Sequence, residues 1–175
     1  MELEFDRTPE DIIAFNLFHM THSASARREA LTTRVLISLV VAWFAGGYNI
    51  LNPAYFNWVV GGAALAAALV VFFVYPPLAR YFTVDRLRKM LKEGNNETMF
   101  GPQRVAIAPE GILASNKTSE SKLAWAAVQQ VAEGEKHLFL FTSTMHAIVI
   151  PKIAFKSDEA KREFVRLVES YRKAG

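Results

Sequence analysis

The four histidines of this sequence are its side chains best suited to metal binding or proton transfer, and they form two pairs. His19 and His22 are three residues apart within a predicted helix, so both imidazoles lie on one side of it, as a shared metal ion requires. No acidic residue follows within the next turn to complete a ligand set. We therefore predict no metal site at this pair.

His137 and His146 lie in or beside two predicted strands and could face one another across the turn at Ser143 and Thr144. A serine beside a histidine acts as a nucleophile when an acid and an oxyanion hole accompany the pair. Ser143 has neither a nucleophile elbow nor an oxyanion glycine around it. The sequence also lacks a phosphate-binding glycine loop. We predict no catalytic residue, no cofactor and no enzymatic activity.

Positions 35–79 form a run of 45 residues without a charged side chain. One apolar helix needs about 20 residues to cross the hydrocarbon core of a bilayer. The run therefore has room for two spans, which we place at about Val35–Ile50 and about Phe56–Tyr75. The turn between them is marked by Asn49, Asn52, Pro53 and Asn57.

Basic residues flank the outer ends of the two spans. Arg27, Arg28 and Arg34 precede the first span, and Arg80, Arg86, Arg88, Lys89 and Lys92 follow the second. Because loops rich in Lys and Arg remain in the cytoplasm, both termini are predicted to be cytoplasmic in a multi-pass protein of the inner membrane. Tyr48, Tyr55, Phe56 and Trp58 cluster at the turn, where aromatic rings favour the opposite headgroup zone.

The five basic residues after the second span are the candidate binding site of the sequence. Pro76 and Pro77 are predicted to interrupt the helix, and residues 80–100 then form a basic amphipathic helix at the cytoplasmic surface. One interpretation is attraction to anionic lipid headgroups, worth about 1 kcal/mol per basic residue. The other is orientation of the chain during insertion. No nucleic acid partner is predicted, because a recognition helix and an exposed aromatic platform are both missing.

Small residues occur in both spans and allow close helix packing. They include Ala42, Gly46 and Gly47 in the first span and Gly61 to Ala64 and Ala66 to Ala68 in the second. Packing of the two spans on each other and formation of a homo-oligomer both fit this pattern. A transport pathway is not predicted, because the two spans carry no acidic or basic side chain and few polar groups.

The segments on either side of the spans predict one small α+β unit. Residues 2–6 are expected to form a strand, and Thr8 caps a helix from Pro9 toward His22. Ser23 or Ser25 caps the helix that enters the bilayer. From Gly101 onward the hydrophobic period changes to two, and tight turns separate short strands, which predicts an antiparallel meander. A last helix begins after Ser157 and places Phe164 against the sheet.

These pieces resemble the YcxB-like family of bacterial membrane proteins. The resemblance rests on the acidic N-terminal strand and helix ahead of two spans, the segment Pro109 to Ile112, Trp125, the run His137 to Phe141, and the segment Ile150 to Ser157. It covers essentially the whole chain and is most specific from Trp125 to Ser157. It implies a C-terminal domain similar to pleckstrin-homology-like (PH-like) folds, a partial barrel capped by the last helix, and transfers no catalytic or binding residue.

The expected organisation has four parts, namely a strand and helix at 1–34, a transmembrane hairpin at 35–79, a basic linker helix at 80–100 and the YcxB-like domain at 101–175. We expect a membrane-anchored, non-enzymatic module that binds a protein partner and anionic lipid at the cytoplasmic face. Immunity to a membrane-acting toxin is one alternative. A membrane-bound hydrolase or transferase is another.

Overall fold

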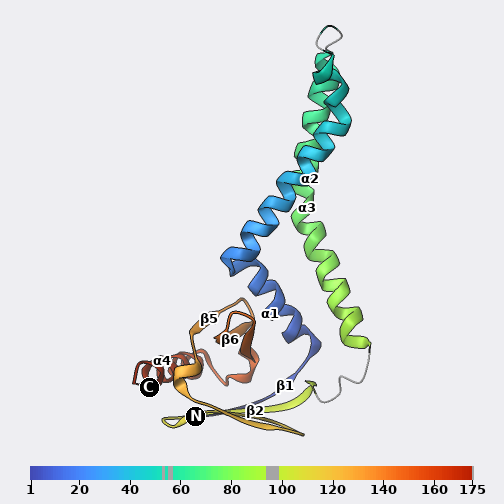
Figure 1. Cartoon of the computed structure of the whole chain (residues 1–175). Helices are drawn as coiled ribbons and strands as arrows, with labels where there is room; N and C mark the ends of the chain where they lie inside the picture. Colours follow the sequence, from blue (N-terminus) through green and yellow to red (C-terminus); the bar gives the residue numbers. More distant parts are fainter. Residues whose placement is uncertain (53, 55–56, 94–98, 175) are drawn as a thin grey trace. The chain divides into compact units, whose positions relative to one another are not determined.

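The computed structural model describes residues 1–52, 54, 57–93 and 99–174. The predicted turn residue Pro53, the predicted interfacial rings of Tyr55 and Phe56, and residues 94–98 of the predicted linker lie outside this part of the chain. In chain order the elements are β1 (Glu2–Arg7), α1 (Pro9–His22), α2 (Ala24–Leu51), α3 (Trp58–Lys92), β2 (Gly101–Ala108), β3 (Gly111–Asn116), β4 (Glu120–Leu123), η3 (Trp125–Ala127), β5 (Gln130–Glu133), β6 (His137–Ser143), β7 (His146–Pro151), η4 (Lys152–Ala154) and α4 (Asp158–Ala174) (Figure 1).

The chain divides into two compact units, and each is described by itself. One unit contains Met1–Phe18 together with Leu87–Gly175, and the other is His19–Arg86. The first unit therefore joins segments from both sides of the apolar helices, as the sequence predicted. The predicted α+β class is confirmed, with two long apolar helices and two antiparallel sheets.

In the described residues the strands form two sheets, in the orders β1-β2-β3-β4 and β5-β6-β7. Within each sheet every strand pairs with the strand that precedes or follows it, which confirms the predicted antiparallel pairing. The predicted meander is divided between β4 and β5, which belong to different sheets. The described strands remain two separate sheets and do not close into a barrel. In the first pairing Glu2 lies opposite Ala106 and Arg7 lies opposite Gly101. The chain therefore leaves the sheet after β1 and re-enters it at the neighbouring position of β2.

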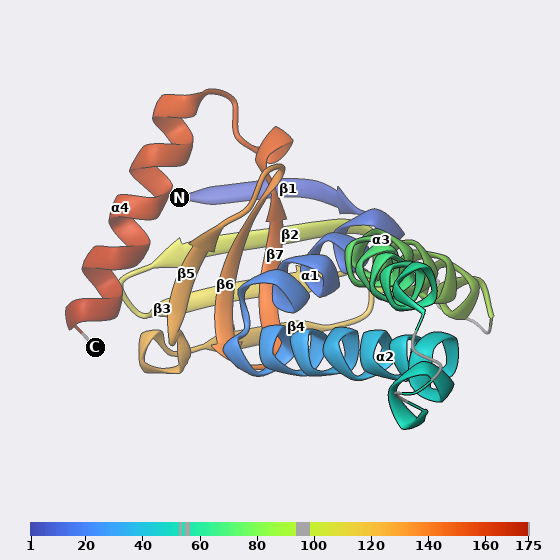
Figure 2. The same cartoon turned by 90° about the horizontal axis from the view of Figure 1, so that it is seen from above.

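The two sheets enclose a hydrophobic core, and their strands cross in Figure 2. Ile112 of β3, Leu140 of β6 and Ile150 of β7 are fully buried in it. Successive side chains of a strand point to opposite faces. Leu138 and Leu140 therefore face the core, whereas Phe139 faces the other side of β6 and is also buried. Both faces of the three-stranded sheet are covered.

Helix α1 covers the outer face of that sheet (Figure 2). The ring centroids of Phe15 and Phe141 are 5.8 Å apart, and those of Phe18 and Phe139 are 4.6 Å apart. Gly134, in the turn between β5 and β6, makes room for this contact: a Cβ there would lie 2.9 Å from the ring of Phe139 and 3.4 Å from that of Phe18. Aromatic stacking therefore attaches α1 to the sheet.

The C-terminal helix α4 is capped and oriented as predicted. The hydroxyl of Ser157 accepts a hydrogen bond from the backbone N–H of Ala160 at 3.2 Å. Phe164 and Val168 are fully buried in the core. The ring of Tyr171 lies 5.3 Å from that of Trp125, whose indole N–H donates to the carbonyl of Ala108 at 2.8 Å. Helix α4 thus seals one side of the core.

In the second unit, helices α2 and α3 are both long and apolar enough to cross a membrane. Ser23 caps α2, since its hydroxyl accepts from the N–H of Ala26 at 3.5 Å. The amide side chain of Asn49 closes the turn by bonding the backbone N–H and C=O of Asn57 at 2.8 and 2.9 Å. Asn57 in turn accepts the N–H of Val59 at 2.9 Å. The asparagines that marked the turn in the sequence therefore build it.

The prediction that Pro76 and Pro77 interrupt the second helix was wrong. Helix α3 runs without a break from Trp58 to Lys92, and the prolines lie inside it. The prediction rested on the missing N–H groups of proline and on its clash with the preceding turn. Two adjacent prolines remove only two hydrogen bonds, and the long helical segments on either side keep the remaining ladder. The predicted linker helix is therefore, up to Lys92, the end of α3.

The two apolar helices pack against each other where their residues are smallest. Gly46 and Gly47 of α2 and Ala64 of α3 are buried. A Cβ placed on Gly46 would lie 2.9 Å from the Cβ of Ala64. Any larger residue at position 46 would force the helices apart. Gly62 is different, since a Cβ there would meet nothing within 4 Å.

Candidate functional site

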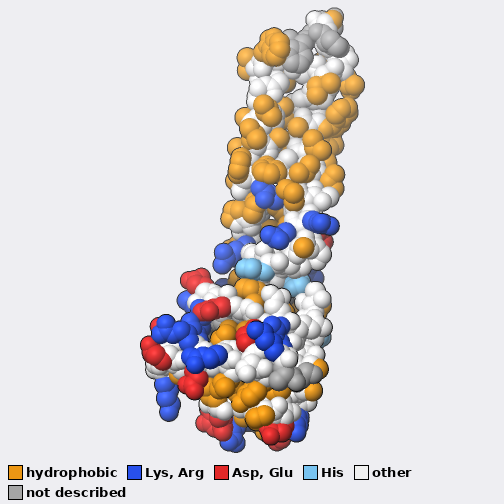
Figure 3. Space-filling view, turned by 90° about the vertical axis from the view of Figure 1, so that its left-hand side faces the viewer, with side chains coloured by type: hydrophobic (Ala, Val, Ile, Leu, Met, Phe, Trp, Pro, Cys, Tyr) orange, Lys and Arg blue, Asp and Glu red, His pale blue; other side chains and the backbone are white. Residues whose placement is uncertain are grey.

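The apolar side chains of α2 and α3 point outward. In the most apolar part of each helix only 17% and 6% of the residues are buried within the structure. Phe44 and Trp58 are 84% and 83% exposed. The space-filling view shows hydrophobic side chains along this pair of helices and Lys and Arg side chains at one end of the apolar part (Figure 3). A helix in the core of a water-soluble domain would bury these groups.

The five basic residues predicted as a binding site lie along the last part of α3 and are all exposed. Helical periodicity puts Arg86, Lys89 and Lys92 away from a half-buried stripe of Val84, Leu87 and Leu91, whereas Arg88 lies at the edge of this stripe. Arg80 lies in line with this stripe, one turn nearer the apolar segment. The predicted amphipathic pattern is present over the last turns of α3. The five side chains form an extended charged surface along the helix.

A pair of buried titratable residues, missed in the sequence, joins α1 to the outer face of β6. His137 Nε2 and Asp11 Oδ1 are 2.7 Å apart, and the two side chains are 12% and 6% exposed. The other carboxylate oxygen of Asp11 accepts the backbone N–H of Thr8 at 2.6 Å and its hydroxyl at 3.0 Å. Asp11 therefore forms hydrogen bonds both with Thr8, at the beginning of α1, and with His137 of β6, a strand remote in the sequence.

The electrostatics of this pair favour an ionised Asp11. Burial alone raises the pKa of Asp11, but the hydrogen bonds from His137 and Thr8 together outweigh it, and the pKa lies below its ordinary value. Burial also lowers the pKa of Arg7, and the nearby charge of Asp11 opposes that change. The Nε atom of Arg7 is buried without a hydrogen-bond partner among the described residues.

The expectation that His137 and His146 face one another was wrong. In the β6–β7 hairpin His137 pairs with Pro151 and His146 with Ser143, so the two histidines lie at opposite ends. Antiparallel pairing puts the first residue of one strand beside the last of the other, and this separates them. The hydroxyl of Ser143 accepts the N–H of Met145 at 3.2 Å.

The Asp11–His137 pair has part of a catalytic arrangement, an acid bonded to an imidazole. The hydroxyl placed by the fold, that of Thr8, donates to the carboxylate rather than to the imidazole. A triad requires the reverse order, with the imidazole between hydroxyl and acid. The geometry therefore fits a buried structural contact. His19 and His22 both belong to α1, and no group of three potential ligands for a metal ion occurs among the described residues.

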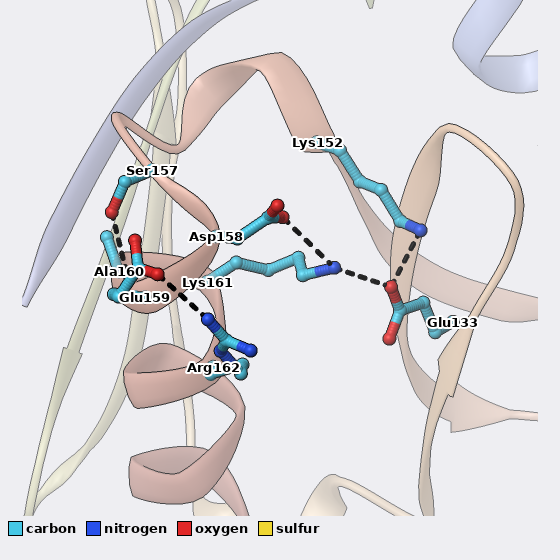
Figure 4. A network of polar contacts seen from close by, with 8 residues as sticks. All are labelled: Glu133, Lys152, Ser157, Asp158, Glu159, Ala160, Lys161 and Arg162. Carbon is cyan, nitrogen blue, oxygen red and sulfur yellow. Dashed lines mark hydrogen bonds and ion pairs between the residues drawn. The ribbon is translucent and has the colours of Figure 1, made fainter.

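A second polar network holds three elements of the domain together (Figure 4). Glu133 Oε1, at the end of β5, lies 2.6 Å from Lys152 Nζ of η4 and 2.8 Å from Lys161 Nζ of α4. Hydrogen bonds from Lys152 and Lys161 lower the pKa of Glu133 to about 2. On α4 itself, Arg162 pairs with Glu159 at 2.9 Å. These contacts fix the start of α4 against the β5–β6 turn.

Comparison with known proteins identifies one segment of the chain. Neither the curated proteins nor the solved structures contain a match. A family model, in contrast, matches a segment that begins within β2, contains the strands β3 to β7 and reaches into α4. This segment is shorter than the resemblance expected from the sequence, which covered essentially the whole chain. Residues 107–168 match the family model described as YcxB-like protein, which confirms the predicted YcxB-like resemblance over about a third of the chain.

Proposed function

We propose that this protein is a membrane-anchored interaction module of the bacterial inner membrane. Helices α2 and α3 form a transmembrane hairpin, both chain termini are cytoplasmic, and the β-domain binds a protein partner at the cytoplasmic face. The observation that carries this proposal is an outward-facing apolar hairpin inserted between two neighbouring strands of one sheet.

The dimensions of the helices support the hairpin. At 1.5 Å per residue, α2 is about 42 Å long and α3 about 52 Å, whereas the hydrocarbon core is about 30 Å thick. The charge-free run 35–79 covers the larger part of each helix, on the side that adjoins the turn. Basic residues flank that run on both outer sides, which supports cytoplasmic ends.

The strand arrangement supports a PH-like domain. A four-stranded and a three-stranded antiparallel sheet, followed by a C-terminal helix, agree with what the YcxB-like resemblance implies. In this proposal the membrane hairpin replaces the connection between the first two strands.

A protein partner is proposed because the sheets leave strands at their edges. An edge strand presents unpaired backbone groups that a partner strand can use. The strand orders put β1, β4, β5 and β7 at edges. The basic end of α3 adds attraction to anionic lipid, in keeping with its exposed Arg and Lys side chains. The hydroxyl of Thr8 donates to the carboxylate of Asp11 and not to the imidazole of His137. Because a catalytic triad needs the hydroxyl beside the imidazole, this order supports a non-enzymatic role.

The test is purification of the tagged full-length protein from its native membranes in mild detergent, with mass spectrometry of associated proteins. The same preparation is made with Phe164→Asp, which disrupts the domain core, and with Arg166→Asp, which places the same side chain at an exposed site of α4. The proposal expects a partner in near-equal amount that is lost with Phe164→Asp and kept with Arg166→Asp. Recovery of no partner, or of one unaffected by Phe164→Asp, would contradict it.

A further inference from the structure

Arg34 is a half-buried cation at the beginning of the apolar run. Its guanidinium carbon lies 4.1 Å from the ring centroid of Phe72 on α3, which is a cation–π stacking distance. The Nε atom is buried and has no hydrogen-bond partner in the part of the chain that the structure describes. Ser38, one turn further on the same face of α2, is 9% exposed, and its hydroxyl is also buried without a partner among those residues.

No acidic side chain compensates the charge of Arg34. The sequence contains no Asp or Glu between Glu29 and Asp85. None of the ion pairs among the described residues includes Arg34. A buried charge is costly unless it is paired and hydrogen-bonded. The guanidinium of Arg34 can only donate hydrogen bonds, and the hydroxyl of Ser38 can donate one as well as accept. The positive charge of Arg34 therefore favours a ligand that is a negatively charged acceptor.

We propose that Arg34 binds the phosphate group of an anionic lipid. This inference rests on the proposed membrane hairpin, which places position 34 where the hydrocarbon core ends and the headgroup zone begins. The contact with Phe72 restricts the position of the guanidinium. Its fork of N–H groups matches two phosphate oxygens. The site therefore differs from the extended basic surface of α3, whose side chains are exposed along the helix.

The test uses full-length protein in phosphatidylcholine vesicles with a small fraction of spin-labelled phosphatidylglycerol or spin-labelled phosphatidylcholine. The measured quantity is the preference of the protein for the anionic label. Arg34→Gln should lower it about fivefold, the effect of about one basic residue at the membrane surface. The matched control is Arg28→Gln, an exposed arginine of the same helix, which should lower it less. Equal losses, or no loss at Arg34, would overturn the proposal.

Two further measurements sharpen the assignment. Arg34→Lys keeps the charge but loses the planar fork, so part of the preference should be lost; full retention would contradict a site built by stacking. If circular dichroism shows that Arg34→Gln is unfolded, Arg34→Lys tests the site in its place, because it keeps the charge. Excess inorganic phosphate at matched ionic strength should leave the lipid bound, and displacement would assign the site to free phosphate instead.

Alkaline extraction of membranes separates this inference from the proposed function. A protein that stays with the membranes, and whose Arg34→Gln variant keeps its lipid preference, refutes the Arg34 site and leaves the hairpin intact. A protein released by alkali refutes the hairpin, and the lipid site with it.

Discussion

At the residue scale, the buried contact of Asp11 with His137 is the interaction that the sequence did not predict. In the sequence Glu10 and Asp11 are two acids in the first turn of a helix, where acids complement the helix dipole. Glu10 is exposed and fits that description, whereas Asp11 points inward to a histidine 126 positions away. No local pattern distinguishes the two. Only the docking of α1 on β6 does so.

Removal of His137 should therefore destabilise the domain. His137→Ala leaves a buried carboxylate without its partner, and we expect a loss of about 3 kcal/mol in the free energy of unfolding, measured by denaturant titration in detergent. Asp11→Asn should cost about 1 to 3 kcal/mol. Glu10→Gln is the control and should change little. Equal effects of Glu10→Gln and Asp11→Asn would mean that Asp11 acts only on the helix dipole.

The same contact predicts an acid limit to stability. The folded-state pKa of Asp11 is below its ordinary value of 3.8. The stabilisation is therefore fully present above that ordinary value and is lost as the pH falls through the lower folded value. Titration of stability against pH should show a smaller acid loss in Asp11→Asn than in the unchanged protein. Superimposable curves would argue against a paired, ionised Asp11.

At the element scale, the helices are held by contacts that local sequence predicts to different extents. The helix α4 was predicted with its cap and its buried face, because Ser157 and the period of Phe164 and Val168 are both local signals. The predicted interruption of the helix at Pro76 and Pro77 was wrong, because a local rule for proline neglects the long helical segments on both sides. The register of β1 with β2 could not be predicted, since α1, α2 and α3 lie between them in the sequence.

Burial of α4 gives a prediction for the core. Phe164→Asp places a carboxylate in a fully buried position and should reduce stability by several kcal/mol, about 3 to 5 or more. Arg166→Asp introduces the same group at an exposed position and should cost far less. Denaturant titration of both variants makes the comparison. A small loss with Phe164→Asp would refute the placement of α4.

The ion pairs of Glu133 predict a smaller, salt-sensitive effect at the start of α4. The side chain of Glu133 is 47% exposed, so solvent screens its two lysine contacts, and Glu133→Gln should cost only about 1 kcal/mol. With a folded pKa of about 2, this contribution is present above the ordinary value of 4.5 and declines as the pH falls toward 2. Glu135→Gln, in the same turn, is the control. An effect of Glu133→Gln that persists in high salt would contradict this account.

The contact of Gly46 with Ala64 predicts how the two apolar helices tolerate bulk. Gly46→Leu should separate α2 from α3 and cost about 1 to 3 kcal/mol, seen as a lower thermal midpoint of helicity in detergent. Gly62→Leu adds the same side chain to open space and should leave the midpoint unchanged. The reverse order of effects would show that α3 packs through its other face, as expected for a homo-oligomer.

At the scale of the whole molecule, the helices and strands could be predicted from the sequence better than the contacts between them. The charge-free run from 35 to 79 indicated the two long helices, and alternating hydrophobic residues after Gly101 indicated the strands. That β1 completes the sheet begun by β2 depends on backbone pairing across the hairpin, which has no signature in local composition. The Arg34 contact with Phe72 was likewise invisible, because it needs the register of two helices.

The central claim is that α2 and α3 cross the membrane and return, with the β-domain on the cytoplasmic side. The chain has no cysteine, so single cysteines can report accessibility without background. In intact cells, a membrane-impermeant maleimide should label a cysteine at Ala54, in the connection between the helices, and should label one at Lys117, in the β3–β4 turn, only after the membrane is permeabilised. Labelling of both positions from outside, or of neither before permeabilisation, would contradict the account.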